Sequence, residues 1–90
     1  MKKNDLLFLI STGGGDREKG TSMSLIKAAE YAQKKNCKVI SLIGKSGGEL
    51  KKISDHYVLV ENYTTSHIQE AHIAILHCIC ELLDNFYNKN

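Results

Sequence analysis

The chain has 90 residues, a formal net charge of +2 and three cysteines, and 42% of its residues are hydrophobic. This length fits one domain, which would bury only about 60% of the surface that its unfolded chain exposes. The near-neutral charge and the lack of a basic stripe with interleaved aromatic residues argue against nucleic acid as a partner. No apolar stretch approaches the roughly 20 residues of a membrane span, and no signal-peptide pattern is present, so we expect a cytoplasmic protein with no membrane partner.

The first predicted element is a strand over 6–11, which contains five consecutive apolar residues. An unbroken apolar run of this length is typical of a parallel-sheet strand that is buried on both faces. A glycine-rich loop over 12–20 follows, and it is longer than most connections between a strand and a helix. Thr21 or Ser22 is expected to cap the next helix, which is predicted over 22–35.

A strand, a glycine-rich turn and a helix start in this order can form an anion site. Glycines let the backbone approach a ligand, and the free amides of a helix start point at negative charge. The alternative is a flexible turn without a ligand. Asp16 would repel phosphate, so it either bonds a sugar hydroxyl or caps the loop. We predict that the phosphate of a small sugar phosphate is held by Ser11, Thr12, Gly13, Gly14 and Gly15.

The rest of the chain continues the alternation of strands and helices. Strands are predicted over 38–43 and 57–60, a short helix over 49–54, and a long helix over 66–85 with Ser66 and Gln69 at the spacing of a capping box. This β-α-β-α-β-α order predicts an α/β fold, a parallel sheet with helices on both faces. In such sheets ligands lie beyond the carboxyl ends of the strands.

The last helix combines polar residues with two adjacent apolar stripes, so we expect the sheet or another chain to cover it. Gln69 and His77 lie eight residues apart, about 80° around the helix, so both can lean toward one pocket, which His72 flanks. A histidine in an apolar stripe is more often a buried imidazole than a catalytic group. Cys37, Cys78 and Cys80 are interpreted as small buried apolar residues.

Three segments carry a resemblance to a known family. Residues 7–12 with the glycine loop, 24–32 and 37–48 resemble the sugar isomerase (SIS) domain. The segment 67–77 is similar to the last helix of phosphoheptose isomerases, which convert sedoheptulose 7-phosphate to D-glycero-D-manno-heptose 7-phosphate. The resemblance implies a Rossmann-like SIS half-domain over residues 1–90, the C-terminal half of that family's domain, with the N-terminal half absent.

The resemblance also implies roles for individual residues. In that family a Ser/Thr-rich loop binds the substrate phosphate, and this loop falls on Ser11 and Thr12. The helix motif places Gln69 and His77 in the active site, where they can bind zinc, and His77 is also implied in proton transfer. Two departures are the Gly13 that replaces a hydroxyl residue and the absent first half.

The function expected from these features is sugar-phosphate binding as part of a phosphoheptose isomerase. The isolated chain is expected to be inactive, and either self-association or a chain supplying the missing half is expected as its partner. The alternatives are a non-catalytic phosphosugar sensor or regulatory subunit, and a structural fragment that binds nothing.

Overall fold

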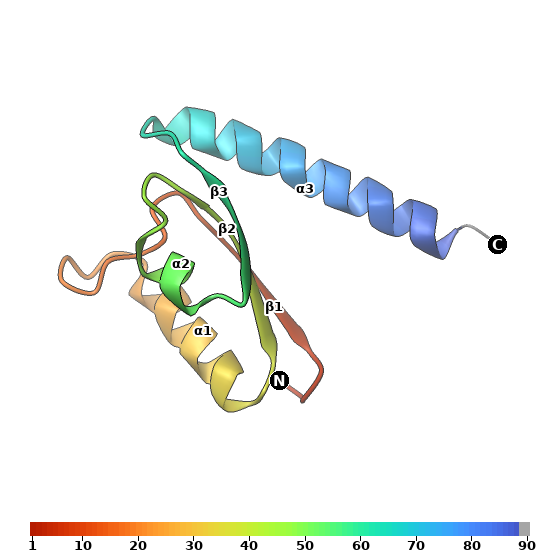
Figure 1. Ribbon diagram of the computed structural model, residues 1–90, viewed down its shortest axis with the longest axis horizontal. Helices are drawn as coiled ribbons and strands as arrows, with labels where there is room; N and C mark the ends of the chain where they lie inside the picture. The colour runs from red at the N-terminus through yellow and green to blue at the C-terminus, as the bar shows by residue number, and fades with distance from the viewer. Residues whose placement is uncertain (89–90) are drawn as a thin grey trace.

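The computed structural model describes residues 1–88 and shows a three-stranded parallel sheet with helices on both faces (Figure 1). Its elements are β1 (Leu6–Ser11), α1 (Met23–Lys34), β2 (Lys38–Gly44), α2 (Gly48–Ile53), β3 (His56–Val60) and α3 (Thr65–Tyr87). The strand order is β1-β2-β3, with β2 in the centre. The predicted α/β class and order of elements are therefore confirmed.

The strand register brings the carboxyl ends of the three strands to one edge of the sheet. Ser11 at the end of β1 pairs with Ile43 of β2. Gly44, the next residue, pairs with Val60 at the end of β3. The loop after β1, the glycine turn before α2 and the start of α3 consequently meet at this edge, as expected for a parallel sheet.

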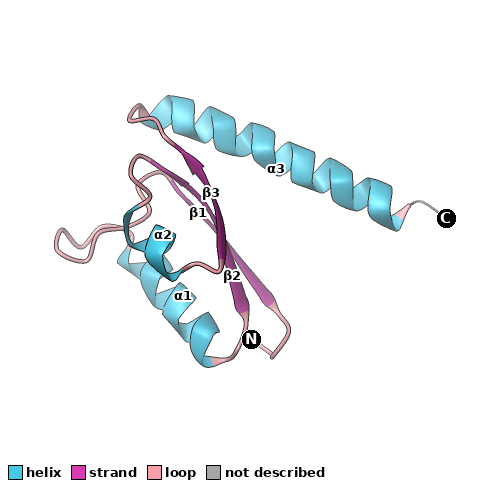
Figure 2. Cartoon of the chain, viewed as in Figure 1, coloured by secondary structure: helices cyan, strands magenta, loops and turns pink. Residues whose placement is uncertain are grey.

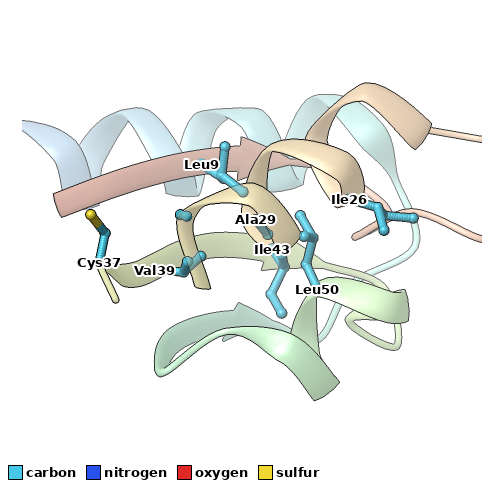
Figure 3. Close-up of a cluster of buried hydrophobic side chains, with 8 residues drawn as sticks. Leu9, Ile26, Ala29, Cys37, Val39, Ile43 and Leu50 are labelled. Atoms are coloured by element: carbon cyan, nitrogen blue, oxygen red, sulfur yellow. The ribbon is translucent and has the colours of Figure 1, made fainter. Parts of the chain in front are cut away.

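The main core lies between the sheet and the two N-terminal helices. Figure 2 shows α1 and α2 on one face of the sheet and α3 on the other. Small side chains on α1, including Ala29 and Ala32, let this helix pack closely on the strands. The core cluster, most of which is labelled in Figure 3, consists of Leu9, Ile26, Ala29, Ala32, Cys37, Val39, Ile43 and Leu50.

The opposite face of the sheet is only partly covered. The expectation that the first strand is buried on both faces is wrong for this chain, because Leu6 and Ile10 are 55% and 45% exposed. The physical reason is that β1 is an edge strand and that α3 packs on β2 and β3. Ile68 and His72 are the buried residues of α3, whose C-terminal part extends past the sheet (Figure 1).

Two expectations about helix starts and one about the cysteines need correction. Ser22 takes the N-cap position of α1 but makes no side-chain capping bond. The N-cap of α3 is Thr64, so the capping box predicted at Ser66 is wrong. Cys37 is buried as predicted, whereas Cys78 and Cys80 are exposed, because the two apolar stripes on which they lie reach beyond the covered part of α3. Within residues 1–88, no helix has the length and apolar character to cross a bilayer.

Candidate functional site

The loop after β1 is interlocked with the turn before α2. The carbonyl oxygen of Gly14 accepts a 2.8 Å hydrogen bond from the Leu50 amide, and that of Gly15 accepts one of 2.9 Å from the Glu49 amide. Gly14 has a φ of 73°, and a Cβ on it would overlap the carbonyl of Gly47. Glycine is therefore required here for close packing of two loops, and this holds whether or not a ligand binds.

Ser11 organises the same loop from the end of β1. Its side chain is buried, and its Oγ accepts a 3.0 Å hydrogen bond from the Gly14 amide. The Oγ of Ser22 lies 3.5 Å away, so the end of the strand is linked to the start of α1. Two of the residues predicted to bind phosphate, Ser11 and Gly14, thus bond to each other in the structure.

The six residues before Ser22 form a small closed loop. Asp16 and Thr21 exchange two backbone hydrogen bonds of 3.0 Å. The Oδ1 of Asp16 accepts bonds from the amides of Glu18 and Lys19, at 2.9 and 3.2 Å. Two roles were considered for Asp16, binding a sugar hydroxyl and capping the loop. In the structure its carboxylate caps the loop, because it accepts hydrogen bonds from amides of that same loop.

Arg17 anchors this closed loop to two helices. Its guanidinium lies 3.1 Å from a carboxylate oxygen of Glu30 on α1 and 3.0 Å from one of Glu49 on α2. The hydrogen bonds that the guanidinium donates, to Glu49 first and then to Glu30, raise the pKa of Arg17. The positive charge of Arg17 is therefore matched by protein carboxylates.

A groove of about 520 Å³ lies between the end of β1, the start of α1 and one side of α3. Ser11, Thr12 and Ser22 contribute hydroxyl groups at one end of the groove. The remaining lining residues are Ile10, Leu25, Gln69, His72, Ile73 and Leu76. The groove combines hydroxyls, an amide and an imidazole with an apolar wall, which is the composition of a site for a small polar ligand.

The structure brings together some of the predicted site residues and separates others. Ser11, Thr12 and Gln69 line the same groove. The run Gly13–Gly15 lies in the adjoining loop, outside the lining, and His77 is exposed on α3 beyond it. The assignment of these residues to phosphate binding or catalysis stays a prediction.

The proposed metal ligands, Gln69 and His77, do not make a zinc site by themselves. They lie on one helix about 12 Å apart along its axis. Zinc in proteins is usually held by three or four nitrogen, sulfur or carboxylate donors. Within the described residues, no group of three or more histidine, cysteine or acidic side chains could hold a metal ion.

Two residues of the groove were not assigned by the sequence. His72 was placed only on the flank of the pocket, whereas it is 2% exposed and its Nε2 lies 2.9 Å from the carbonyl oxygen of Ile43. Its position four residues after the buried Ile68 is the signal that could have placed it facing the sheet. Ser22 was treated as a helix cap, and no local pattern shows that it faces the groove.

The chain is similar in sequence and in fold to known proteins. No protein-family model matches the chain. The chain is 40% identical over 86 residues to the phosphoheptose isomerase of a Nitratiruptor species, covering 96% of this chain and 43% of that protein. It is 39% identical over 89 residues to the phosphoheptose isomerase of Helicobacter pylori (strain Shi470), covering 98% and 43%. The solved structure of a phosphoheptose isomerase from Francisella tularensis superposes with a TM-score of 0.83 at 33% identity, over 93% of this chain and 44% of that one.

By fold, the chain is thus an α/β half-domain with a groove beyond the carboxyl ends of parallel strands. By sequence and structure together, it is a partial homologue of the phosphoheptose isomerases. The chain spans about two-fifths of the length of the curated relatives it matches. It covers 43% of each of the two relatives named above. The predicted resemblance of the chain to the phosphoheptose isomerases is therefore confirmed.

Proposed function

We propose that the groove binds a sugar phosphate and that the chain is the C-terminal part of an SIS-type isomerase. The proposed reaction interconverts sedoheptulose 7-phosphate and D-glycero-D-manno-heptose 7-phosphate. The observation that carries this proposal is that Ser11, Thr12, Ser22 and Gln69 line one groove at the strand ends. The phosphoheptose isomerase relatives support the choice of substrate.

The phosphate would occupy the hydroxyl end of the groove. Ser22, the N-cap of α1, lies there, and the first turn of this helix carries no acidic residue. The first amides of a helix have no intrahelical acceptor and favour an anion. Thr12 would add a hydroxyl, and the amides of Gly13 and Gly15 would complete the predicted set. Arg17 is engaged by Glu30 and Glu49, so neutral donors would supply most of the binding.

The reacting carbons would lie toward α3, near Gln69 and His77. Aldose–ketose exchange needs a base and an acid that move a proton between adjacent carbons, and His77 would take one of these roles. Among the described residues, the groove is lined by no carboxylate. The second acid–base group would come from the portion of the relatives that this chain does not span. The same portion would supply any further ligands for zinc beside Gln69 and His77.

The uncovered apolar surface suggests where that portion would pack. Ile10 on β1 and Ile73 on α3 border the groove and are 45% and 54% exposed. We propose that a chain supplying the missing half, or a second copy of this chain, covers this face. We place the protein in the cytoplasm, where its three free cysteines would stay reduced.

A second candidate is a phosphosugar-binding or regulatory module without catalysis. The absence of a carboxylate from the described wall of the groove favours it, because binding needs the hydroxyl end alone whereas isomerisation needs two proton-transfer groups. A turnover assay separates the two candidates once a chain that supplies the missing half is added.

Binding is tested by titrating the isotope-labelled chain with sedoheptulose 7-phosphate and following the amide signals of Gly13 and Gly15. Thr12→Val should weaken binding about tenfold, because it removes one hydrogen bond to a charged oxygen while keeping the shape of the side chain. Thr21→Val is the matched control, since Thr21 lies in the same loop but does not line the groove. Unmoved glycine signals at saturating sugar phosphate would refute the proposal.

A further inference from the structure

The groove has a buried imidazole in its wall with one unpaired nitrogen. His72 is 2% exposed, and its Nε2 lies 2.9 Å from the carbonyl oxygen of Ile43. Its Nδ1 is also buried and has no hydrogen-bond partner among residues 1–88. Buried polar atoms in native proteins are nearly always paired, so an unpaired one needs an explanation.

The one bond that His72 makes defines the chemistry of the other nitrogen. A carbonyl oxygen can only accept, so Nε2 must carry the proton and donate it to Ile43. In the neutral ring, Nδ1 then has a lone pair and no proton. This nitrogen is an acceptor that requires a donor, which the phosphoryl oxygens of a phosphate ester dianion cannot supply.

His72 is part of the groove wall, so a ligand bound in the groove lies next to its ring. The buried hydroxyl of Ser11 already accepts the bond from the Gly14 amide and lies 3.5 Å from Ser22 Oγ. The side chains of Ile73 and Gln69 line the groove beside His72 and are exposed.

We propose that His72 Nδ1 accepts a hydrogen bond from a hydroxyl group of the bound ligand, so that the groove selects a polyhydroxylated phosphate ester over free phosphate. This inference rests on the proposed function and adds a second contact to it. The anion lies at the helix start beside Ser22, and a hydroxyl of the carbon chain lies against His72. His72 is on this view a specificity residue, and it transfers no proton.

The test uses the 90-residue chain labelled with ¹⁵N in its histidine rings and in its backbone. In the free chain, the ring signals of His72 should show a proton on Nε2 and none on Nδ1. Saturating sedoheptulose 7-phosphate should shift His72 Nδ1 in the direction of an accepted hydrogen bond. Inorganic phosphate should move the Gly13 and Gly15 amides and leave Nδ1 where it was. His67, an exposed histidine on the same helix, is the control and should not respond to either.

A variant gives an independent measurement. His72→Gln keeps an N–H for the Ile43 carbonyl but removes the ring acceptor, so affinity for the sugar phosphate should fall about tenfold and affinity for inorganic phosphate should not change. A free chain with the proton on Nδ1 would overturn the inference. So would sugar phosphate that moves the glycine amides but not His72 Nδ1, an outcome that leaves the proposed function intact. If neither set of signals moves, the proposed function and this inference both fail.

Discussion

The backbone amide of Leu50 donates a 2.8 Å hydrogen bond to the carbonyl oxygen of Gly14, which ties the loop after β1 to the first turn of α2. The sequence predicts a ligand site in the first of these two glycine-rich turns, the loop after β1. In the structure they are one unit, because Gly14 packs directly on the backbone of Gly47. Any ligand held by the first turn is therefore held by a loop that α2 keeps in place.

Replacing Gly14 with alanine should destabilise the chain severely. Gly14 has a φ of 73°, and the added Cβ would overlap the Gly47 carbonyl, so the two loops would have to separate. We expect a loss of at least about 3 kcal/mol in the free energy of unfolding, from backbone strain and lost loop packing together. Thermal unfolding should show a fall of more than about 12 °C, at roughly 4–8 °C per kcal/mol for a domain of this size.

Two other glycines provide matched controls for this prediction. Gly20 has a φ of 70° but open space around it, so Gly20→Ala should cost only the conformational term of about 1–2 kcal/mol. Gly13 has open space and no positive φ, so Gly13→Ala should change the stability by less than about 0.5 kcal/mol. Equal losses in all three variants would contradict the loop interlock.

Arg17→Gln should loosen the closed loop without unfolding the domain. The guanidinium bridges an exposed Glu30 and a partly buried Glu49, but ion pairs of an exposed arginine contribute little to global stability. We expect faster hydrogen exchange at the Asp16 and Thr21 amides, with the thermal midpoint nearly unchanged. Added salt should have the same effect on the unmodified chain, because it screens exposed charges. Lys19→Gln, which removes a charge from the same loop, should not speed exchange.

The pH dependence of the Arg17 ion pairs follows from the direction in which the pKa of Arg17 is shifted. Glu49 and then Glu30 raise the pKa of Arg17 in the folded chain. An interaction that raises the pKa of a basic group stabilises the folded chain at every pH below the pKa that the group has in the unfolded chain. This contribution is lost only as the pH rises through the raised pKa of the folded chain. Arg17 therefore does not titrate between mildly acidic and mildly alkaline pH. Hydrogen exchange at the Thr21 amide, corrected for its intrinsic rate, should not change over this range because of Arg17.

Local patterns of the sequence predict the elements well and the neighbours of each element poorly. The apolar runs predicted over 6–11 and 38–43 identify β1 and β2, and the sheet-edge rule brings Ser11, Thr12 and Gln69 to one groove. The same apolar pattern cannot show that β1 lies at an edge, because burial on the second face depends on what packs there. Ser22 was missed as a groove residue, and His72 was predicted on the flank of the pocket but not in its buried wall, because their positions depend on how α1 and α3 cross the sheet.

The cysteines offer a direct check on which side chains the fold covers. Cys37 is 4% exposed, and its thiol donates to the carbonyl oxygen of Lys2, whereas Cys78 and Cys80 are exposed. A thiol reagent should therefore modify two of the three cysteines rapidly in the dilute native chain, and the third only after denaturation. Cys37→Ser should remove the slow thiol and leave the two fast ones. Rapid modification of all three, or of one alone, would contradict the structure.

The exposed end of α3 should drive association between chains. Leu83 and Phe86 are 51% and 72% exposed on the part of the helix that extends past the sheet. A helix without tertiary packing is marginal in water, and burying a large apolar side chain contributes about 1.5–3 kcal/mol, so these residues gain stability from a partner. Sedimentation velocity over a concentration series should show self-association, which Leu83→Glu and Phe86→Glu each weaken at least about tenfold. His67→Glu adds the same charge to an exposed position near the other end of α3 and should leave association unchanged. A chain that stays monomeric throughout the series would rule out self-association as the cover of this surface and would leave a chain supplying the missing half as its occupant.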